Sequence, residues 1–275
     1  MQVMNKLILW LWILGMLSWT GTVGVSAEGF LQGEEEMLRP GKVSIIIDDF
    51  GSGQKGTEEM LQLPVKITAA VMPFLSTSRE DAERAHAAGH DVIIHMPMEP
   101  RQGKASWLGP GAITTSMSHQ EIRQTLEAAI QGVPHAVGMN NHMGSRITGD
   151  ERIMSVVLEV CREHGLFFVD SKTNYRSVAG RLAVEKGLPD ISNHLFLDDI
   201  HTKAHVVKQL KLASEYGAKH QYCVTIGHVG IDGLITAEGL SDSVAELQRQ
   251  GVEFIGISQL VLESTGWSRD VLPVR

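Results

Sequence analysis

Residues 42–51 read KVSIIIDDFG, an apolar run that ends in two adjacent carboxylates, Asp48 and Asp49. Burying one unpaired carboxylate is costly, and a second one beside it adds repulsion unless a cation binds them. The near-continuous apolar run is typical of a strand that is covered on both faces, as in parallel sheets. The sequence therefore predicts a cationic partner at the end of a buried strand.

Further apolar, β-rich runs follow and alternate with helical patterns along the chain. We expect strands at residues 43–47, 67–71, 91–95, 136–139, 166–169, 195–197, 222–226 and 254–257. Strand–helix–strand alternation implies parallel strands joined by right-handed crossovers. The pattern predicts an α/β fold, a distorted (β/α) barrel of about seven or eight mostly parallel strands.

The N-terminal segment differs from the rest of the chain. It has one lysine, then an apolar run, then small residues that end at Ala27, which is the order of a secretory signal peptide. The apolar run is short for a membrane span, which needs about 20 residues, although an uncleaved anchor is the alternative. We expect a signal peptide at 1–27, a polar linker at 28–41 and one domain at 42–275. The expected location is secreted or extracytoplasmic, in the cell envelope, with no membrane span after cleavage.

Charge and cysteine content exclude several classes of protein. The net charge is -8 and no block of lysine or arginine is present, which argues against nucleic acid as a partner. Cys161 and Cys223 have neither the spacing of a zinc knuckle nor that of a redox pair. We therefore expect two separate thiols in the core.

Polar side chains follow five of the predicted strands where each strand ends. The carboxyl ends of parallel strands meet at one mouth of a barrel, so these side chains are expected to converge. They are Asp48, Asp49, His95, Glu99, Asn140, Asn141, His142, Arg146, Asp170, Ser171, Lys172 and His228.

Three of these residues are histidines in the same topological position. Two imidazoles and one carboxylate, with coordination positions left open, are typical of a catalytic zinc or a similar divalent ion, which activates water. Adjacent strand residues point to opposite faces. We therefore expect one aspartate of the Asp48–Asp49 pair to bind the ion and the other to act as general base.

A long loop at residues 101–118 follows the third predicted strand and contains Trp107. In (β/α) barrels, the loops that leave the carboxyl ends of the strands build the active site. Trp107 is expected either to line a lip that faces substrate or to anchor the loop to the body of the domain.

Five motifs in order give the chain a resemblance to a known family. Asp-Asp at 48–49 is followed by HMPMEP at 95–100, NNHMGS at 140–145, DSKT at 170–173 and GHVG at 227–230. This order is similar to that of the divergent polysaccharide deacetylases, a branch of the carbohydrate esterase deacetylase superfamily. The resemblance covers residues 42–262 and implies a distorted (β/α) barrel with a divalent metal, usually zinc.

The resemblance also implies roles for individual residues. Asp48 corresponds to the general base, Asp49 and His95 to metal ligands, and His228 to the acid that protonates the leaving amine. The superfamily's second metal histidine, four residues after the first, is replaced here by Glu99. We therefore assign the second imidazole to His142.

The remaining roles do not follow from a matching motif, because the superfamily's arginine-proline-tyrosine motif is absent. Asp170 is expected to orient His228 or a substrate hydroxyl, and Arg146 to steer a carboxylate. Glu99, Asn141, Arg146 and Trp107 are expected to contact substrate. In the alternative, Glu99 binds loop amides, and Asn140 and Asn141 hold a turn.

The expected function is metal-dependent removal of acetyl groups, mainly N-acetyl, from peptidoglycan or a similar acetylated polysaccharide. Water activated by the ion attacks the acetyl carbon, Asp48 takes its proton, and His228 protonates the leaving group. Because a fold does not fix function, the alternative is a non-catalytic metal- or glycan-binding protein on a deacetylase scaffold.

Overall fold

The computed structural model describes residues 41–268, which belong to one compact unit. The predicted signal peptide and residues 28–40 of the predicted linker lie outside the described residues, as do residues 269–275. The strands within 41–268 are β1 (Lys42–Phe50), β2 (Thr68–Val71), β3 (Asp91–Met98), β4 (Ala136–Met143), β5 (Phe167–Asp170), β6 (Ile191–Ser192), β7 (Leu195–Phe196), β8 (Tyr222–His228) and β9 (Glu253–Phe254).

The strands form one sheet in the order β6-β5-β4-β3-β2-β1-β8-β7, and β9 pairs with the start of β1. Every pair is parallel, so the carboxyl ends of all strands face the same way. Because β6 and β7 stand at the two ends of this order, the barrel is incomplete. The predicted distorted (β/α) barrel is confirmed.

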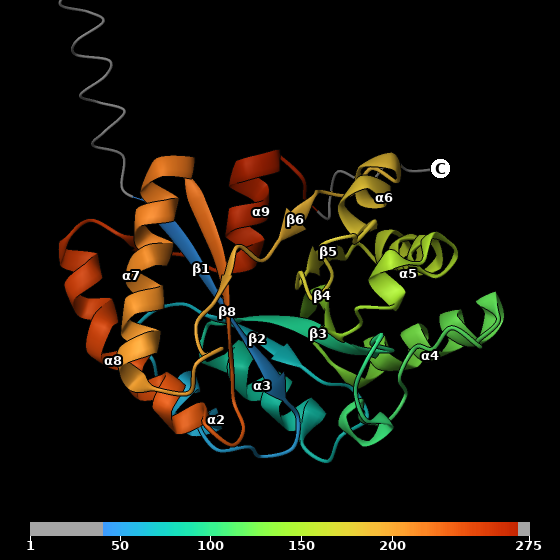
Figure 1. Ribbon diagram of the computed structural model, residues 1–275, viewed down its shortest axis with the longest axis horizontal. Helices are drawn as coiled ribbons and strands as arrows, with labels where there is room; N and C mark the ends of the chain where they lie inside the picture. Colours follow the sequence, from blue (N-terminus) through green and yellow to red (C-terminus); the bar gives the residue numbers. More distant parts are fainter. Residues whose placement is uncertain (1–40, 269–275) are drawn as a thin grey trace, which may run out of the picture. The chain divides into compact units, whose positions relative to one another are not determined.

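Helices connect successive strands and cover the outer face of the sheet. They are α2 (Thr57–Leu61), α3 (Ser78–Ala87), α4 (His119–Gly132), α5 (Glu151–Glu163), α6 (Ala179–Glu185), α7 (Lys203–His220), α8 (Gly233–Arg249) and α9 (Ile257–Thr265), with 3-10 turns at Ala105–Trp107 and Ile147–Gly149. Figure 1 shows α7 and α8 side by side next to β1 and β8, and α4 and α5 beyond β3. Ser118 caps α4 in a capping box, which explains where that helix begins.

The apolar run of β1 is buried on both faces, as expected for a parallel strand. Val43, Ile45 and Ile47 pack into the core between the sheet and the helices. Ile46, one position out of phase, packs into a second core, because successive strand residues face opposite ways. The second core also contains Ile257 and other residues of α9, so α9 covers the end of the barrel opposite the strand carboxyl ends.

Several details differ from the sequence-based expectation. The strand expected at 254–257 is wrong in its second half, because β9 ends at Phe254 and Ile257 already begins α9. Helices α2, α6 and α9 and strand β6 were not expected, since each is short. Cys161 and Cys223 are free and buried, which confirms two separate core thiols. No helix in residues 41–268 is both long and apolar enough to cross a bilayer.

Candidate active site and metal centre

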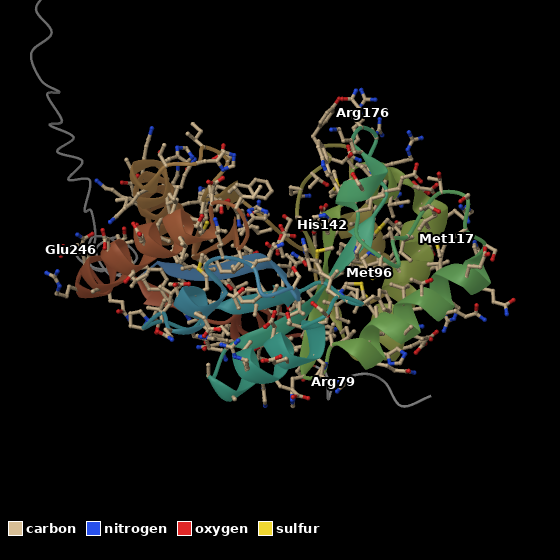
Figure 2. The ribbon with its side chains drawn as sticks, turned by 90° about the horizontal axis from the view of Figure 1, so that it is seen from below. Arg79, Met96, Met117, His142, Arg176 and Glu246 are labelled. Carbon is tan, nitrogen blue, oxygen red and sulfur yellow. The ribbon has the colours of Figure 1, made fainter. Side chains whose placement is uncertain are left out.

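Strand register places the polar residues beside one another. In the β1–β8 pair Asp48 lies opposite His228, and in the β3–β4 pair His95 lies opposite Asn140. His142 lies near the end of β4, and Met96 on β3 lies close to it (Figure 2). These positions are at the carboxyl end of the sheet, where the sequence predicted convergence.

Asp49 has an unusual backbone conformation. Its φ is 72°, in the left-handed region that only glycine, asparagine and aspartate adopt at low cost. The register of β1 against β2 is irregular between Ile47 and Phe50. As a result both carboxylates turn towards His95, with Asp48 Oδ1 3.5 Å from Nδ1 and Asp49 Oδ1 3.3 Å from Nε2. The expectation that the two aspartates face opposite sides is wrong, because the strand does not stay extended.

Three ligand atoms from three strands meet in a triangle. Asp49 Oδ1 lies 3.3 Å from His95 Nε2 and 3.1 Å from His142 Nδ1, and the two nitrogens are 3.1 Å apart. Ligands held at zinc's usual bond lengths in a tetrahedron are separated by about 3.3 Å. Among the described residues these are the three that could jointly hold a metal ion.

Hydrogen bonds on the far side of each ring fix which nitrogen is protonated. Asn140 donates its amide to Asp48 Oδ1 at 2.9 Å, so its oxygen accepts from His95 Nδ1 at 2.7 Å. His142 Nε2 donates to the main-chain oxygen of Trp107 at 3.0 Å. The hydrogen-bond network thus assigns the protons to these outer nitrogens and leaves lone pairs on His95 Nε2 and His142 Nδ1.

All three atoms of the triangle are acceptors in this protonation state. Asp49 Oδ1 is buried and has no hydrogen-bond partner within the described residues, and the two imidazole lone pairs face it. A divalent cation would satisfy all three atoms at once, and two nitrogens with one oxygen suit zinc. The residues fit a metal ion.

Asp48 lies directly behind the triangle and is 2% exposed. Burial is the main reason that its pKa is raised, although His95 and His228 oppose that effect. Asn140 is its hydrogen-bond donor. A buried carboxyl group with a raised pKa, held in a fixed orientation, is suited to accept a proton near neutral pH.

His228 is held by Asp198, a residue that the sequence analysis did not single out. Asp198 Oδ1 lies 2.9 Å from Nδ1 of the ring, and Oδ2 accepts the main-chain N–H of His228 at 2.8 Å and the hydroxyl of Thr236 at 2.9 Å. Burial alone lowers the pKa of His228. The neighbouring carboxylates, Asp198 most of all, outweigh burial and raise the pKa to about 9. The ring is therefore protonated at neutral pH.

Asp170 does not orient His228, contrary to one of its two expected roles. It is 1% exposed, and it binds Lys172 through the main-chain nitrogen at 2.8 Å and Nζ at 3.4 Å. Asp170 is also absent from the described residues that line the cavity at the metal centre. The carboxylate therefore holds the turn after β5, where Lys172 has a φ of 58°.

Glu99 and Arg146 bind each other. Glu99 Oε1 lies 3.1 Å from Arg146 Nε, and Oε2 accepts from the main-chain nitrogen and the hydroxyl of Thr115 at 2.7 and 2.8 Å. Neither residue is among the described residues that line the cavity. Glu99 thus holds the long loop through hydrogen bonds, as in the alternative interpretation, and Arg146 neutralises the charge of Glu99.

Asn141 lines the cavity at the metal centre, whereas Trp107 does not, and both bind other parts of the protein. Asn141 accepts from the main-chain nitrogen of Ser171 at 3.0 Å and donates to the oxygen of Met143 at 2.8 Å, which joins β4 to the loop after β5. Trp107 orients His142 through its carbonyl, while its side chain is 57% exposed. Asn141 therefore holds a turn at the wall of the cavity, and Trp107 has an indole that remains free to face a ligand.

The metal centre opens into two neighbouring cavities. One, of about 320 Å³, is lined by Asp48, Asp49, His95, Pro100, Gln102, Asn141, His142, Met143, Ser145, Ser171, Thr173, Phe196 and His228. The other, of about 580 Å³, is lined by Asp49, Gln54, Phe196, Asp198, Asp199, His201, His228, Val229, Gly230, Ile231, Asp232 and Gly233. Asp49, Phe196 and His228 line both, so the centre lies between them.

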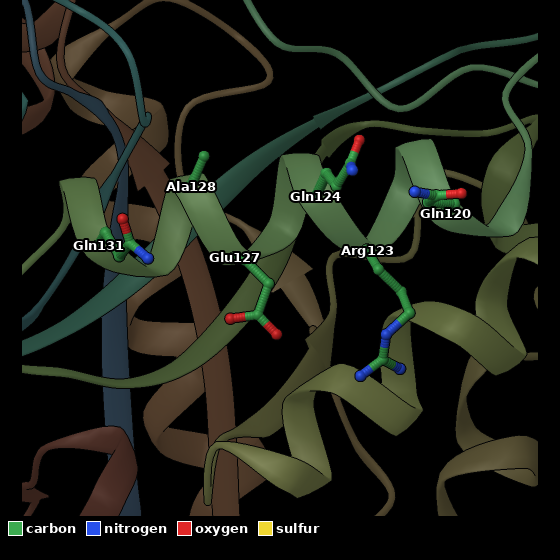
Figure 3. A pocket seen from close by; sticks show the side chains of 6 residues that line it. All are labelled: Gln120, Arg123, Gln124, Glu127, Ala128 and Gln131. Atoms are coloured by element: carbon green, nitrogen blue, oxygen red, sulfur yellow. The ribbon is translucent and has the colours of Figure 1, made fainter.

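A third cavity lies along α4 and shares no lining residue with these two (Figure 3). Its charged side chains are already paired with α5, Arg123 with Glu163 and Glu127 with His164. It has no cluster of metal-ligating or nucleophilic side chains of its own. The chemistry of the described domain is therefore concentrated at the strand ends.

Comparison with known proteins identifies the family. Residues 45–261 match the family described as divergent polysaccharide deacetylase. The chain belongs to this family. The resemblance in the five motifs is therefore confirmed, and the deacetylase-like scaffold extends over nearly all of the described residues.

The chain is also similar to individual proteins. An uncharacterised protein of Haemophilus influenzae is 37% identical over 187 residues, which are 68% of this chain and 66% of that protein. The chain thus spans slightly less than two thirds of this relative. The crystal structure of the uncharacterised protein ATU2773 from Agrobacterium tumefaciens has a TM-score of 0.76 at 20% identity, covering 81% of this chain and 90% of that one.

A more distant structure shares the fold. The Bc1960 peptidoglycan N-acetylglucosamine deacetylase has a TM-score of 0.50 at 11% identity, covering 80% of this chain and 90% of that one. At such low identity the likeness concerns the fold alone. Both structures support the (β/α) barrel fold of this chain.

Two residues of the site were missed by sequence analysis. Asp198 stands in LFLDD, residues 195–199, where two carboxylates follow an apolar strand as they do at Asp48 and Asp49; this repeat of the opening pattern was the available signal. Asn140 was interpreted as a turn residue, and no local sequence feature distinguishes it from Asn141. Its bridge between His95 and Asp48 depends on strands that are 45 and 92 residues away in sequence.

Proposed function

We propose that this member of the divergent polysaccharide deacetylases is a metal-dependent hydrolase that removes acetyl groups, mainly N-acetyl, from a cell-envelope polysaccharide. One observation carries the proposal: Asp49, His95 and His142 present three unprotonated ligand atoms to one point beside Asp48 and His228. This arrangement combines a metal site, a base and an acid in one cavity.

A divalent ion at this point, zinc in our proposal, would polarise the acetyl carbonyl and increase the acidity of water. The protein's own residues supply the proton transfers. Asp48 accepts a proton from the water whose oxygen bonds to the acetyl carbon. His228 donates a proton to the nitrogen as the carbon–nitrogen bond breaks, so that acetate and a free amine leave. Positioned groups of this kind each contribute about 10²–10⁴-fold to the rate.

The ordinary superfamily arginine is replaced in function by other groups in this proposal. Asn140 orients the base through its hydrogen bond to Asp48, and Asp198 orients the acid. Both partners are buried, so the geometry of the catalytic pair is held without the arginine-proline-tyrosine motif. The name of the similar Bc1960 enzyme supports N-acetylglucosamine units as the place of attack.

The test is acetate release from N-acetylated chito-oligosaccharides and from peptidoglycan by zinc-loaded protein, compared with the Asp48→Asn variant. We expect the variant to lose at least about 10²-fold in kcat while it still binds zinc, because Asn replaces the base and not a ligand. Tight glycan binding without acetate release by the wild-type protein, across several divalent metals, would favour the non-catalytic alternative.

Export to the cell envelope is part of the proposal and rests on the signal peptide expected at residues 1–27. The N-terminal sequence of the protein recovered from cells tests it. Mature protein that begins after Ala27 is the expected result, and protein that retains the apolar run would point to the anchor instead.

A further inference from the structure

The catalytic centre lies between two arms of an extended binding region. The first arm is the 320 Å³ cavity, whose rim is formed by the loops after β3, β4 and β5. The second is the 580 Å³ cavity beside the loops after β7 and β8. Its lining includes Asp199 and Asp232, which pair with His205 and His201. Since both arms meet at His228, a ligand longer than one sugar would contact both.

The first arm is bordered by three cations without a carboxylate partner in residues 41–268. Arg101 lies between the cavity-lining residues Pro100 and Gln102 in the loop after β3, Lys104 follows in the same loop, and Arg176 lies in the loop after β5. The two other cations of these loops are different, because Arg146 pairs with Glu99 and Lys172 with Asp170. Exposed lysines and arginines are usually solvated, but three unpaired ones beside one arm of a catalytic cavity are positioned to meet a ligand.

Two of the three cations lie beside exposed aromatic rings. Lys104 Nζ is 5.6 Å from the centre of the Trp107 ring, and the Arg176 guanidinium is 5.5 Å from the centre of the Tyr175 ring. These rings are 57% and 90% exposed. An exposed ring beside a cation offers an apolar face and a positive charge together. A pyranose that bears a carboxylate has both complementary features.

The cations are tied to the metal centre through short connections. Arg101 donates its main-chain N–H to Ser145 Oγ at 2.9 Å and its Nε–H to the oxygen of Ser145 at 3.2 Å, and Ser145 lines the cavity. Trp107 is hydrogen-bonded to the metal-centre residue His142. Figure 2 shows Arg176 at the outer end of the loops that rise beside His142. Arg101 thus borders the first arm, and Lys104 and Arg176 stand on loops of the same rim, where the sugar next to the reacting acetamide would enter.

We propose that the first arm binds a carboxylate on the glycan, carried by the sugar next to the one that loses its acetyl group. The inference rests on the proposed function and specifies its substrate as an anionic acetylated glycan. The chain has a net charge of -8, which repels anionic polymers, so local cations at the cleft are needed to bind one. The carboxylate can belong to a lactyl ether, as in muramic acid, or to a uronic acid.

The experiment compares acidic and neutral forms of the same oligosaccharide. The substrates are a tetrasaccharide of alternating N-acetylglucosamine and N-acetylmuramic acid, its methyl ester, and a tetrasaccharide of alternating N-acetylglucosamine and glucuronic acid. We expect kcat/KM for an acidic form to exceed that for its ester by about tenfold, the sum of three exposed charge contacts. Whichever acid is preferred identifies the source of the carboxylate.

Charge-removing variants link the preference to the arm. In the Arg101→Gln/Lys104→Gln/Arg176→Gln variant we expect the preference for acid over ester to disappear. In the wild-type protein we expect added salt to weaken this preference. Lys104→Gln/Arg176→Gln leaves the contacts of Arg101 intact and should lose most of the preference. The matched control is Lys186→Gln/Lys208→Gln/Lys219→Gln, which removes three unpaired charges from helices and their ends, and should keep the preference.

The outcomes separate this inference from the proposed function. Equal use of acid and ester by the wild-type protein, or a preference that survives in the triple variant, would overturn the inference while acetate release upholds the function. If no substrate releases acetate, the function fails, and calorimetric titration of the Asp48→Asn protein still decides the inference. The acidic oligosaccharide must then bind about tenfold tighter than its methyl ester. Any smaller difference rejects the inference that the first arm binds a carboxylate.

Discussion

Asp198 binds His228 through both carboxylate oxygens, one on the ring nitrogen Nδ1 at 2.9 Å and the other on the main-chain nitrogen at 2.8 Å. Because Oδ2 also binds the main-chain nitrogen, the carboxylate is fixed beside the ring, and the ring cannot turn away without breaking the contact at Nδ1. The carboxylate also stabilises the imidazolium and raises the pKa of His228 to about 9. Nε2 is left as the ring atom available to a ligand in the cavity.

Replacing this carboxylate should shift the charge of His228. In Asp198→Asn we expect the pKa of His228 to fall from about 9 towards the ordinary value of about 6.5, because the amide no longer stabilises the cation. If His228 is the acid, the alkaline limb of kcat/KM moves to lower pH with it. NMR titration of the ring in metal-free protein and the pH profile of the zinc-loaded protein measure the two effects. Asp199→Asn, which removes the neighbouring carboxylate that pairs with His205, should leave both unchanged.

The same pair makes stability depend on pH in a defined direction. The folded-state pKa of His228, about 9, is above the unfolded value of about 6.5. The ion pair therefore contributes its full stability below about pH 6.5 and loses this contribution as the pH rises through about 9. The difference in unfolding free energy between wild-type and Asp198→Asn should therefore be largest near pH 6 and shrink by pH 10. Denaturant unfolding at both pH values tests this, and a difference that grows with pH would contradict it.

Metal binding should depend on His142 and not on histidines in general. His142→Ala removes one corner of the 3.1–3.3 Å triangle and leaves two ligands, so we expect zinc at well below about one equivalent after dialysis, and no rise in melting temperature on adding zinc. His119→Ala, at the exposed start of α4, is the matched control and should behave as wild-type. Full retention of zinc by His142→Ala would exclude His142 as a ligand.

Asn140 is expected to affect both metal affinity and stability although it is not a ligand. Asn140→Ala removes the acceptor of His95 Nδ1 and the donor to Asp48, and both groups stay buried. Loss of such an outer partner typically weakens metal binding by about 10–100-fold, and unpaired buried groups cost about 1–3 kcal/mol. Zinc titration and chemical unfolding of the metal-free protein measure the two. Unchanged affinity would mean that Asn140 does not set the orientation of His95.

Asp48 and Asp49 illustrate which features of the site the sequence could predict and which it could not. Strands, their parallel order and the gathering of Asp49, His95 and His142 follow from local pattern, because parallel strands bring their carboxyl ends to one edge. The direction of the Asp49 side chain does not follow, because it depends on one positive φ in a run that otherwise reads as an extended strand. That turn coincides with an irregular register against β2, and register is not visible in the sequence of β1 alone.

Polar residues near the site were harder to assign than the ligands themselves. Glu99 and Arg146 looked like substrate contacts because each follows a strand, but opposite charges at two neighbouring strand ends neutralise each other. Asp170 likewise forms an ion pair, with Lys172. Asp198 escaped notice because β7 is only two residues long. Short strands and ion pairs between distant segments are set by tertiary packing, so motif order alone does not reveal them.

The backbone conformation of Asp49 gives a final prediction, in which two variants lack the same carboxylate. Asp49→Ala and Asp49→Gly should both lose zinc. At φ 72° alanine is strained by about 1–2 kcal/mol, whereas glycine adopts this conformation freely. After allowing for the greater entropy of unfolded glycine, we expect Asp49→Gly to be more stable than Asp49→Ala by about 1 kcal/mol. Denaturant unfolding of the two metal-free variants measures this difference. The same comparison at Asp48, whose φ is not positive and which pairs in register with His228, should favour alanine. A preference for alanine at both positions would show that Asp49 does not adopt the left-handed conformation.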